Sequence, residues 1–426
     1  MKQVFEKQIL KVTLALGALA LVACGESSQN ATVSGDVSVQ VPWAENTAKP
    51  QLKDKTLLGL ESLETLNGRY VKFMVHPKEA SSGEINGQDL KAQFEKIGSK
   101  FIPKDALSAQ LAAVYVHFQK LHQLDASLGI AENLTWPRRV AVVTVNRSGE
   151  TNNAFYEGDG DLYVFLPYQN SEMPLTVNGG VVAHEHFHAH FFQLITKQLK
   201  QHGINPFELI KTESPLKNSV KESKQREQEA LLGNLKLEEY EKWIYQAILL
   251  RGLNEGLADY WGYLYSSDED FLKRSLPRMG SNRSLKMTEG KNLIYASSSL
   301  LKLISKSETM RSRYRNLEIN TEAYALATQH AKFLKALAEK IAADKQIDLP
   351  EAKHQLAKIL LEGMSQYAEH LITVHQKKEL PTVQSFNAIL AAHSEFRNLK
   401  ESCALLQKAL AIENGKAECL QPEAKK

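Results

Sequence analysis

The chain has 426 residues, of which 43% are hydrophobic and 24% are charged, and its formal net charge is +3. This length suggests about two or three domains with a substantial core, and the near balance of charge excludes the basic surface typical of a nucleic-acid-binding protein. Without Lys2, Lys7, Lys11 and Glu6, the chain keeps 49 basic and 48 acidic residues, a net charge of +1. We therefore expect no nucleic acid among its partners.

Residues 1–23 are typical of an export signal peptide. Lysines precede an apolar run from Val12 to Ala23, which is too short to span a bilayer. Residues 21–24, with the sequence LVAC, resemble a bacterial lipobox, in which Cys24 becomes the lipidated first residue of the mature protein. This resemblance implies a lipid anchor to a membrane of the bacterial cell envelope, in the periplasm or at the outer membrane and cell surface. An unmodified Cys24 beside an ordinary cleavage site is the alternative.

Residues 24–52 are rich in Ser, Asn, Thr, Gly and Gln, a composition that predicts a flexible tether. After it we expect an α+β lobe over residues 53–205 and a helical lobe over residues 206–426, so the predicted fold class is α+β, mostly helical. Hydrophobic spacing and turn residues predict a helix at residues 106–128, strands at 139–146 and within 152–165, and helices at 237–264, 323–343, 349–375 and 383–412.

Residues 184–188 have the sequence HEHFH, which matches the pattern HExxH. On a helix, residues four apart share a face, so His184 and His188 can direct their imidazoles at one metal ion while Glu185 lies beside them as a base. The pattern is short enough to occur by chance, and histidines on a helix are more often packed or solvated. Apolar residues on both sides of the pattern favour a buried helix, with which we expect the first lobe to end.

A strand over the same residues is the alternative, and it would align four histidines along one face: His184, His186, His188 and His190. A strand would turn Glu185 away from the metal, and the run of residues 191–195 breaks the alternation that a strand needs. On a helix, His186 and His190 point elsewhere. We expect both of them to be packed or in solvent.

The predicted helix at residues 237–264 carries a third candidate ligand, Glu255, in the sequence NEGLAD. Asp259 lies four residues further on, where it can accept the outer N–H of a ligand histidine and raise its basicity. Small residues at 252, 256 and 258 favour close packing of this helix, because glycine costs a helix about 1 kcal/mol relative to alanine. The alternative is that Glu255 and Asp259 form a solvated acidic edge.

HExxH followed by NEGLAD resembles the gluzincin zinc metallopeptidases, and within them the thermolysin and fungalysin branch. Residues 152–165 also resemble the edge strand of that family, whose Asn-Ala pair, here Asn153 and Ala154, hydrogen-bonds the backbone of the substrate. The resemblance covers about residues 100–305. It implies a zinc cofactor, a peptide or protein substrate, and a thermolysin-like fold of two lobes with the HExxH helix at their junction.

Two features depart from the family. Glu255 follows His188 by 67 positions, which is a longer spacer than usual, and the charged segment 211–228 within it is predicted to be an exposed insertion. In addition, residues 290–306 contain no histidine, although the family uses one on a later helix to stabilise the oxyanion. Tyr295 lies near the expected place and can donate such a hydrogen bond, but single aromatic residues in apolar helices usually pack.

Cys403 and Cys419 are the only cysteines besides Cys24. An even pair in an exported protein predicts a disulfide, which would stabilise the fold by about 3 kcal/mol in the chain-entropy model. Two buried thiols are the alternative.

These observations predict a lipid-anchored zinc metallopeptidase. His184, His188 and Glu255 would bind zinc and leave one position for water, Glu185 would act as general base, and Asp259 would support a ligand histidine. An inactive or latent peptidase fold that serves as a binding or scaffolding module is the alternative, and the missing histidine favours it. A zinc hydrolase for a cell-wall peptide or an ester is a third possibility.

Overall fold

The structure is a computed structural model that describes residues 33–44, 49–76, 90–143, 151–168, 173–204, 237–286, 297–307, 315–383 and 385–393. The chain divides into two units, Met1–Val33 and Ser34–Lys426, and every element below belongs to the second. Several predictions lie outside the described residues. They are the signal peptide (residues 1–23), the lipidated Cys24, the insertion (residues 211–228), the candidate Tyr295, and the disulfide between Cys403 and Cys419.

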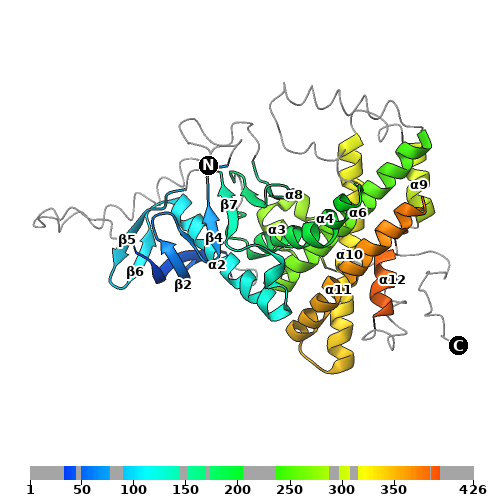
Figure 1. Cartoon of the computed structure of the whole chain (residues 1–426). Helices are drawn as coiled ribbons and strands as arrows, with labels where there is room; N and C mark the ends of the chain where they lie inside the picture. Colours follow the sequence, from blue (N-terminus) through cyan, green and yellow to red (C-terminus); the bar gives the residue numbers. More distant parts are fainter. Residues whose placement is uncertain are drawn as a thin grey trace, which may run out of the picture. The chain divides into compact units, whose positions relative to one another are not determined.

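The second unit combines two small sheets with long helices, which confirms the predicted α+β class (Figure 1). The first sheet has the strand order β3-β2-β1-β6-β5, with β1 (Gly35–Trp43), β2 (Gln51–Ser62), β3 (Asn67–Gly68), β5 (Phe94–Ile97) and β6 (Lys100–Pro103). The second sheet has the order β4-β7-β9-β8, with β4 (Val71–Phe73), β7 (Arg138–Val142), β8 (Ala154–Glu157) and β9 (Leu162–Phe165).

Strand β1 shows that the predicted tether over residues 24–52 is wrong for residues 35–43. Val37, Val39, Val41 and Trp43 occupy alternate positions of this strand and are buried. β1 pairs antiparallel with β2, which already begins at Gln51. Polar residues between the buried ones kept the apolar content of the segment low, so its composition concealed a strand period of two.

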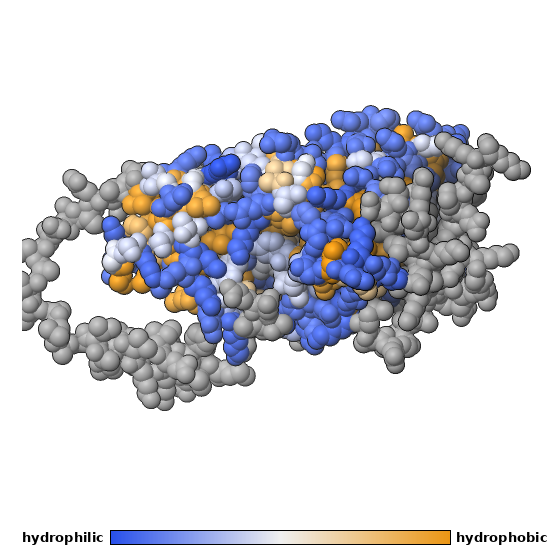
Figure 2. Space-filling view, turned by 90° about the horizontal axis from the view of Figure 1, so that it is seen from below, coloured by the Kyte–Doolittle hydropathy of each residue, from blue (hydrophilic) through white to orange (hydrophobic). Residues whose placement is uncertain are grey.

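Helix α2 (Ala106–Leu128) has the predicted bounds and covers one face of the first sheet. The Asp105 side chain accepts a hydrogen bond from the Ser108 N–H at its start, and Gly129, with φ 75°, ends it. The helix contacts β1 and β2, and the Tyr115 hydroxyl donates to the Leu58 carbonyl oxygen at 2.8 Å. Figure 2 shows hydrophobic residues on the surface over the first sheet, where two apolar side chains are exposed, Leu52 and Ile97.

The second sheet places β8 at its edge, as the sequence predicted. β8 pairs antiparallel with β9, so that Ala154 lies opposite Phe165 and Glu157 lies opposite Leu162, and residues 158–161 form the turn between them. β7 corresponds to the strand predicted at residues 139–146, but residues 144–150 lie outside the described part. Among the described strands, β8 pairs with β9 alone and is therefore an edge strand of this sheet.

The other helices follow mostly as predicted. They are α3 (Gly179–Phe191), α4 (Lys197–Gln201), α6 (Leu237–Ser266), α7 (Phe271–Ser275), α8 (Pro277–Gly280), α9 (Ser297–Lys306), α10 (Arg315–Lys345), α11 (Leu349–Gln376) and α12 (Ser385–Ala392). α6, α10 and α11 confirm three predicted helices, whereas the one predicted at residues 383–412 is described only to residue 393. Within the described ranges, no helix is both long and apolar enough to cross a membrane.

Helix α6 packs against α3 on one side and against α10 on another. A Cβ atom added at Gly262 would lie 2.8 Å from the carbonyl oxygen of Gly180 on α3. One added at Gly256 would lie 2.6 Å from the carbonyl oxygen of Ala327 on α10. The small residues of α6 therefore permit the close helix contacts that the sequence predicted. As a result, α3 with the HExxH residues lies directly beside α6, which carries Glu255.

Candidate metal centre

Helix α3 carries the HExxH residues in a buried position. Asn178 caps its start, because the side-chain oxygen accepts hydrogen bonds from the N–H groups of Gly180 and Val181 at 3.1 and 3.4 Å. Val182 and Phe187 are fully buried on it. The alternative of a strand over these residues is therefore excluded, and the two motif histidines share one helix face.

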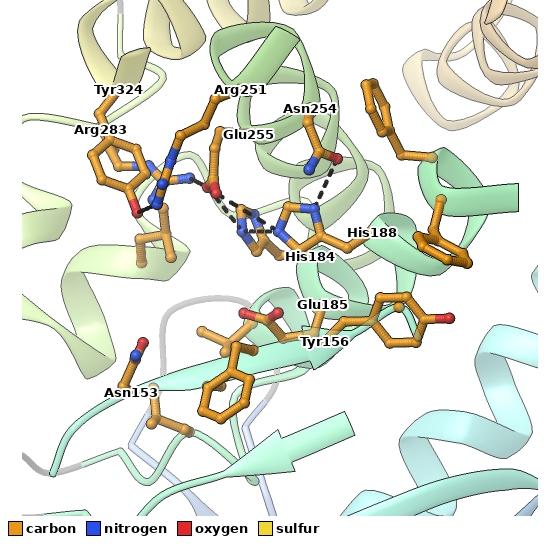
Figure 3. A pocket seen from close by; sticks show the side chains of 18 of the residues that line it. Asn153, Tyr156, His184, Glu185, His188, Arg251, Asn254, Glu255, Arg283 and Tyr324 are labelled. Atoms are coloured by element: carbon orange, nitrogen blue, oxygen red, sulfur yellow. Dashed lines mark hydrogen bonds and ion pairs between the residues drawn. The ribbon is translucent and has the colours of Figure 1, made fainter. Parts of the chain in front are cut away.

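Three side chains converge where the sequence predicted a metal (Figure 3). The Nε2 atoms of His184 and His188 lie 3.1 Å apart. Glu255 Oε2 lies 3.5 Å from Nε2 of His184, and Glu255 Oε1 lies 4.0 Å from Nε2 of His188. All three side chains are at most 12% exposed. The two helices thus bring the predicted ligands together from positions 67 residues apart in the chain.

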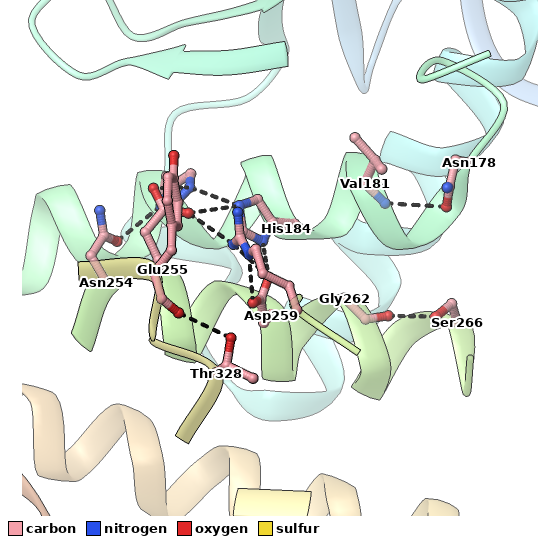
Figure 4. A network of polar contacts seen from close by, with 12 residues as sticks. Asn178, Val181, His184, Asn254, Glu255, Asp259, Gly262, Ser266 and Thr328 are labelled. Atoms are coloured by element: carbon pink, nitrogen blue, oxygen red, sulfur yellow. Dashed lines mark hydrogen bonds and ion pairs between the residues drawn. The ribbon is translucent and has the colours of Figure 1, made fainter. Parts of the chain in front are cut away.

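The donor set fits a tetrahedral cation. Ligand atoms that surround zinc at about 2.0–2.1 Å with tetrahedral angles lie about 3.3 Å from each other, and the three observed separations range from 3.1 to 4.0 Å. The outer nitrogens of both rings face oxygen atoms: His184 Nδ1 lies at ion-pair distance from Asp259 Oδ1, 3.0 Å, and His188 Nδ1 is hydrogen-bonded to Asn254 Oδ1 at 2.9 Å (Figures 3 and 4). Each Nε2 therefore faces the centre of the group, where it could bind a metal ion.

The two histidines have opposite tendencies to take up a proton. Burial disfavours the charged form of His184, but its contacts with Asp259 and Glu255 outweigh burial and raise its pKa to about 9. For His188, burial and the neighbouring charge of His184 lower the pKa to about 4. Without a metal ion, we expect His184 to be positively charged and His188 to be neutral near pH 7. A bound cation would replace this single positive charge.

Arg283 is part of the centre, although no local pattern in the sequence predicted it. Its Nη2 donates to Glu255 Oε2 at 2.9 Å and to Asp259 Oδ1 at 2.7 Å, and its Nε donates to Asp259 Oδ2 at 3.0 Å. Burial opposes the ionisation of Glu255, but the charge of Arg283 and the contact with His184 outweigh it and hold the pKa of Glu255 well below its usual value. Arg283 therefore keeps the candidate ligand Glu255 ionised.

Glu185 lies in the same buried group, and one of its oxygens is within 4.8 Å of the ligand nitrogens of His184 and His188. The side chain is directed toward the cleft rather than toward another helix (Figure 3). Burial raises the pKa of Glu185 to about 7, and the charge of Glu255 adds to this effect. A carboxyl group with such a pKa can both accept and release a proton near neutral pH.

A cavity of about 350 Å³ opens onto this group. Asn153 and Ala154 on β8, the predicted substrate-binding residues, line it together with His184, Glu185, His188 and Glu255.

Arg251, Arg283 and Tyr324 line the cavity from the helical side, and Arg251 Nη2 donates to the Tyr324 hydroxyl oxygen at 3.4 Å. The sequence did not predict these three, because they reach the cleft only through the packing of α6, α10 and the segment after α8. No described histidine of α10, α11 or α12 is among the residues that line it.

A second histidine pair on α3 points away from the cleft. Nε2 of His186 lies 2.8 Å from Asp125 Oδ2, and Nε2 of His190 lies 3.2 Å from Asp125 Oδ1. All three side chains are completely buried. Of the two outcomes expected for these histidines, packing or solvent, the structure shows packing, whereas their carboxylate partner on α2 was not predicted. These residues could also hold a metal ion, but both carboxylate oxygens already accept hydrogen bonds from imidazoles.

No protein-family model matches the chain, and no curated protein matches it in sequence. The resemblance to the gluzincins therefore depends on the motif residues and on the geometry around them. Two groups of described residues could bind a metal ion: Asp125 with His186 and His190, and Glu185 with His184 and His188. The second group opens onto the cleft beside Glu255 and is the better candidate for a functional centre.

Proposed function

We propose that the protein is a zinc metallopeptidase of the gluzincin type. The observation that carries the proposal is the convergence of His184, His188 and Glu255 beside Glu185, in a cleft that faces the edge strand β8. The outer contacts of Asp259 and Asn254 add support, because ligand histidines usually bind a carboxylate or carbonyl oxygen through their other nitrogen. A thermolysin-like arrangement of two lobes and a lipid anchor at Cys24 belong to the same proposal.

Glu185 is the general base in this mechanism. Bound zinc would polarise the carbonyl of the scissile peptide bond and make an adjacent water more acidic. Glu185 accepts a proton as water attacks the carbonyl carbon, and it returns that proton to the nitrogen of the leaving amine when the peptide bond breaks. Arg283 maintains the charge of Glu255, while Asp259 and Asn254 keep the ring nitrogens of His184 and His188 directed at the centre.

The edge strand β8 would bind the substrate backbone. Asn153 and β8 lie across the cleft from the histidine pair (Figure 3). An extended peptide in this space can add to the sheet through main-chain hydrogen bonds at Ala154 and at Asn153, whose carbonyl oxygen also accepts from the Leu166 N–H at 2.9 Å. Such binding requires an extended backbone and depends little on side-chain identity, which favours peptides over other substrates.

Tyr324 is proposed as the hydrogen-bond donor to the oxygen that becomes negative during attack. It lines the cleft, its ring centre lies 4.6 Å from the guanidinium carbon of Arg283, and Arg283 in turn contacts the ligand Glu255. A phenol hydroxyl can donate such a hydrogen bond. This assignment supplies a donor from the described part of the chain at a site where the family would use a histidine.

The test is to measure bound zinc and cleavage of a denatured protein by the purified protein and by its Glu185→Gln variant. We expect one equivalent of zinc in both proteins and hydrolysis only by the wild type. Glu95→Gln on the exposed strand β5 is the matched control and should cleave normally. Zinc without any cleavage would favour a binding module, cleavage by Glu185→Gln would remove Glu185 as the base, and a protein without zinc would overturn the proposal.

A further inference from the structure

The helix that carries the HExxH residues changes its geometry just beyond them. After α3 ends at Phe191, residues Phe192–Thr196 form a π-helical turn, and α4 follows. Such turns are rare and often occur at functional sites. Here the change coincides with the cleft, because Phe191, Phe192 and Thr196 all line it.

Phe192 closes the space between this helix and the turn that follows β8. A Cβ atom added at Gly158 would lie 2.3 Å from the Phe192 ring, so the ring rests directly on the glycine backbone. The rings of Tyr156 and Phe192 also meet edge to face, with centres 6.2 Å apart. The strand side and the helix side of the cleft are therefore in contact at this end.

An ion pair lies over the same contact. Lys200 Nζ on α4 lies 2.5 Å from Asp159 Oδ1 in the β8–β9 turn and 5.1 Å from the centre of the Phe192 ring. Lys200 is partly exposed and Asp159 is exposed, so solvent screens the pair and it contributes little. Tyr156, Gly158, Asp159, Phe192 and Lys200 together form an end wall of the cleft. Phe192 and Gly158 are its main components.

The end wall lies close to the candidate catalytic residues. Phe192 follows His188 by four residues, which corresponds to about 6 Å along a helix. An extended peptide advances about 3.3 Å per residue. For a peptide that runs along α3, about two residues therefore fit between a bond over the metal centre and the end wall. The cavity volume of about 350 Å³ lies near the lower end of the roughly 300–1,000 Å³ typical of sites for small ligands.

We propose that the end wall makes the cleft blind on one side of the scissile bond, so that the protein removes about two residues from a chain end and does not cut inside long chains. This inference rests on the proposed peptidase function. The Tyr156 and Phe192 rings also predict that the residue bound against the wall is apolar, since the rings offer it hydrophobic surface.

Peptides of one sequence test the inference: a short form, a form extended at its N-terminus and a form extended at its C-terminus, with products identified by mass spectrometry. We expect cuts about two residues from one terminus. Extension at that terminus should move the cut along with the new end and lower kcat/KM at the original bond by about 100-fold, because displacement of a reacting bond by 1 Å can cost that much. The terminus at which the cut occurs shows the direction in which peptides bind.

The Phe192→Ala variant should accept the extended peptide at the original bond while it retains zinc and its circular dichroism spectrum. Phe94→Ala on β5, away from the cleft, is the control and should cut as the wild type does. Internal cuts by the wild type without preference for chain ends would overturn the end wall and leave the proposed peptidase intact. A folded Phe192→Ala variant with unchanged cut positions would also overturn the end wall. No cleavage of any peptide would overturn the proposed function, and this inference with it.

Discussion

Replacement of Asp259 by asparagine should weaken zinc binding without a change in side-chain size. Asp259 is completely buried, and its two oxygens contact His184 Nδ1 at 3.0 Å and Arg283 nitrogens at 2.7 and 3.0 Å. All three partners are donors when His184 binds a metal through Nε2. Because asparagine replaces one oxygen by an NH₂ group, at least one of these contacts becomes a meeting of two donors.

The expected loss is about 10- to 100-fold in zinc affinity, or about 1.4–2.7 kcal/mol. The buried Arg283 charge would also lose a charged partner, so we expect the metal-free variant to be less stable than the wild type. Zinc affinity is measured by competition with a chelator of known affinity, and the stability of the metal-free proteins by urea denaturation.

Asp268→Asn is the matched control. Asp268 is also buried and pairs with an arginine, Arg274, but contacts no residue of the candidate centre. This variant should keep the zinc affinity of the wild type. Unchanged zinc affinity in Asp259→Asn, or an equal loss in Asp268→Asn, would refute the role of Asp259 in supporting His184.

Three further predictions concern packing, the second histidine pair and catalysis. Gly256→Ala should destabilise the protein by about 1–3 kcal/mol, measured by urea denaturation, because its Cβ would lie 2.6 Å from the Ala327 carbonyl oxygen; unchanged stability would contradict the close packing of α6 and α10. Asp125→Ala should cost about 3–5 kcal/mol at pH 7. Burial opposes the ionisation of Asp125, but His186 and His190 outweigh burial and lower the pKa of this carboxyl group. The stabilisation by the carboxylate is therefore present above the unfolded pKa of about 3.9 and is lost as the pH falls further. A difference in unfolding free energy between wild type and variant that does not shrink in acid would refute this. Tyr324→Phe should lower kcat by about 100-fold with little change in KM or bound zinc, and a normal kcat would exclude Tyr324 as the donor.

The sequence predicted those parts of the fold that have local signals. The bounds of α2 follow from Asp105 and Gly129 at its ends, and the glycines of α6 indicated close helix contacts before any neighbour was known. β1 was missed because its buried valines alternate with polar residues in a segment whose average composition is polar. A test for a period of two within residues 35–43 would have found it.

For the candidate site, the sequence predicted the motif residues but not their partners. His184, His188 and Glu255 were recognisable by their spacing and by their neighbours, whereas Arg283 and Tyr324 reach the centre only because α10 and the segment after α8 pack against α6. Such contacts depend on tertiary packing and leave no periodic trace in the chain. Asp125 had a weak signal, since it is an acidic residue on a largely buried helix.

Bound zinc in the His188→Ala and His190→Ala variants distinguishes the two places on α3 where a metal ion could bind. Both histidines lie on α3, but His188 faces the cleft and His190 faces Asp125. We expect one equivalent of zinc in the wild type, loss of that zinc in His188→Ala, and zinc content close to the wild type in a folded His190→Ala variant. Zinc retained by His188→Ala and lost from His190→Ala would place the metal at Asp125 instead and contradict the proposed centre.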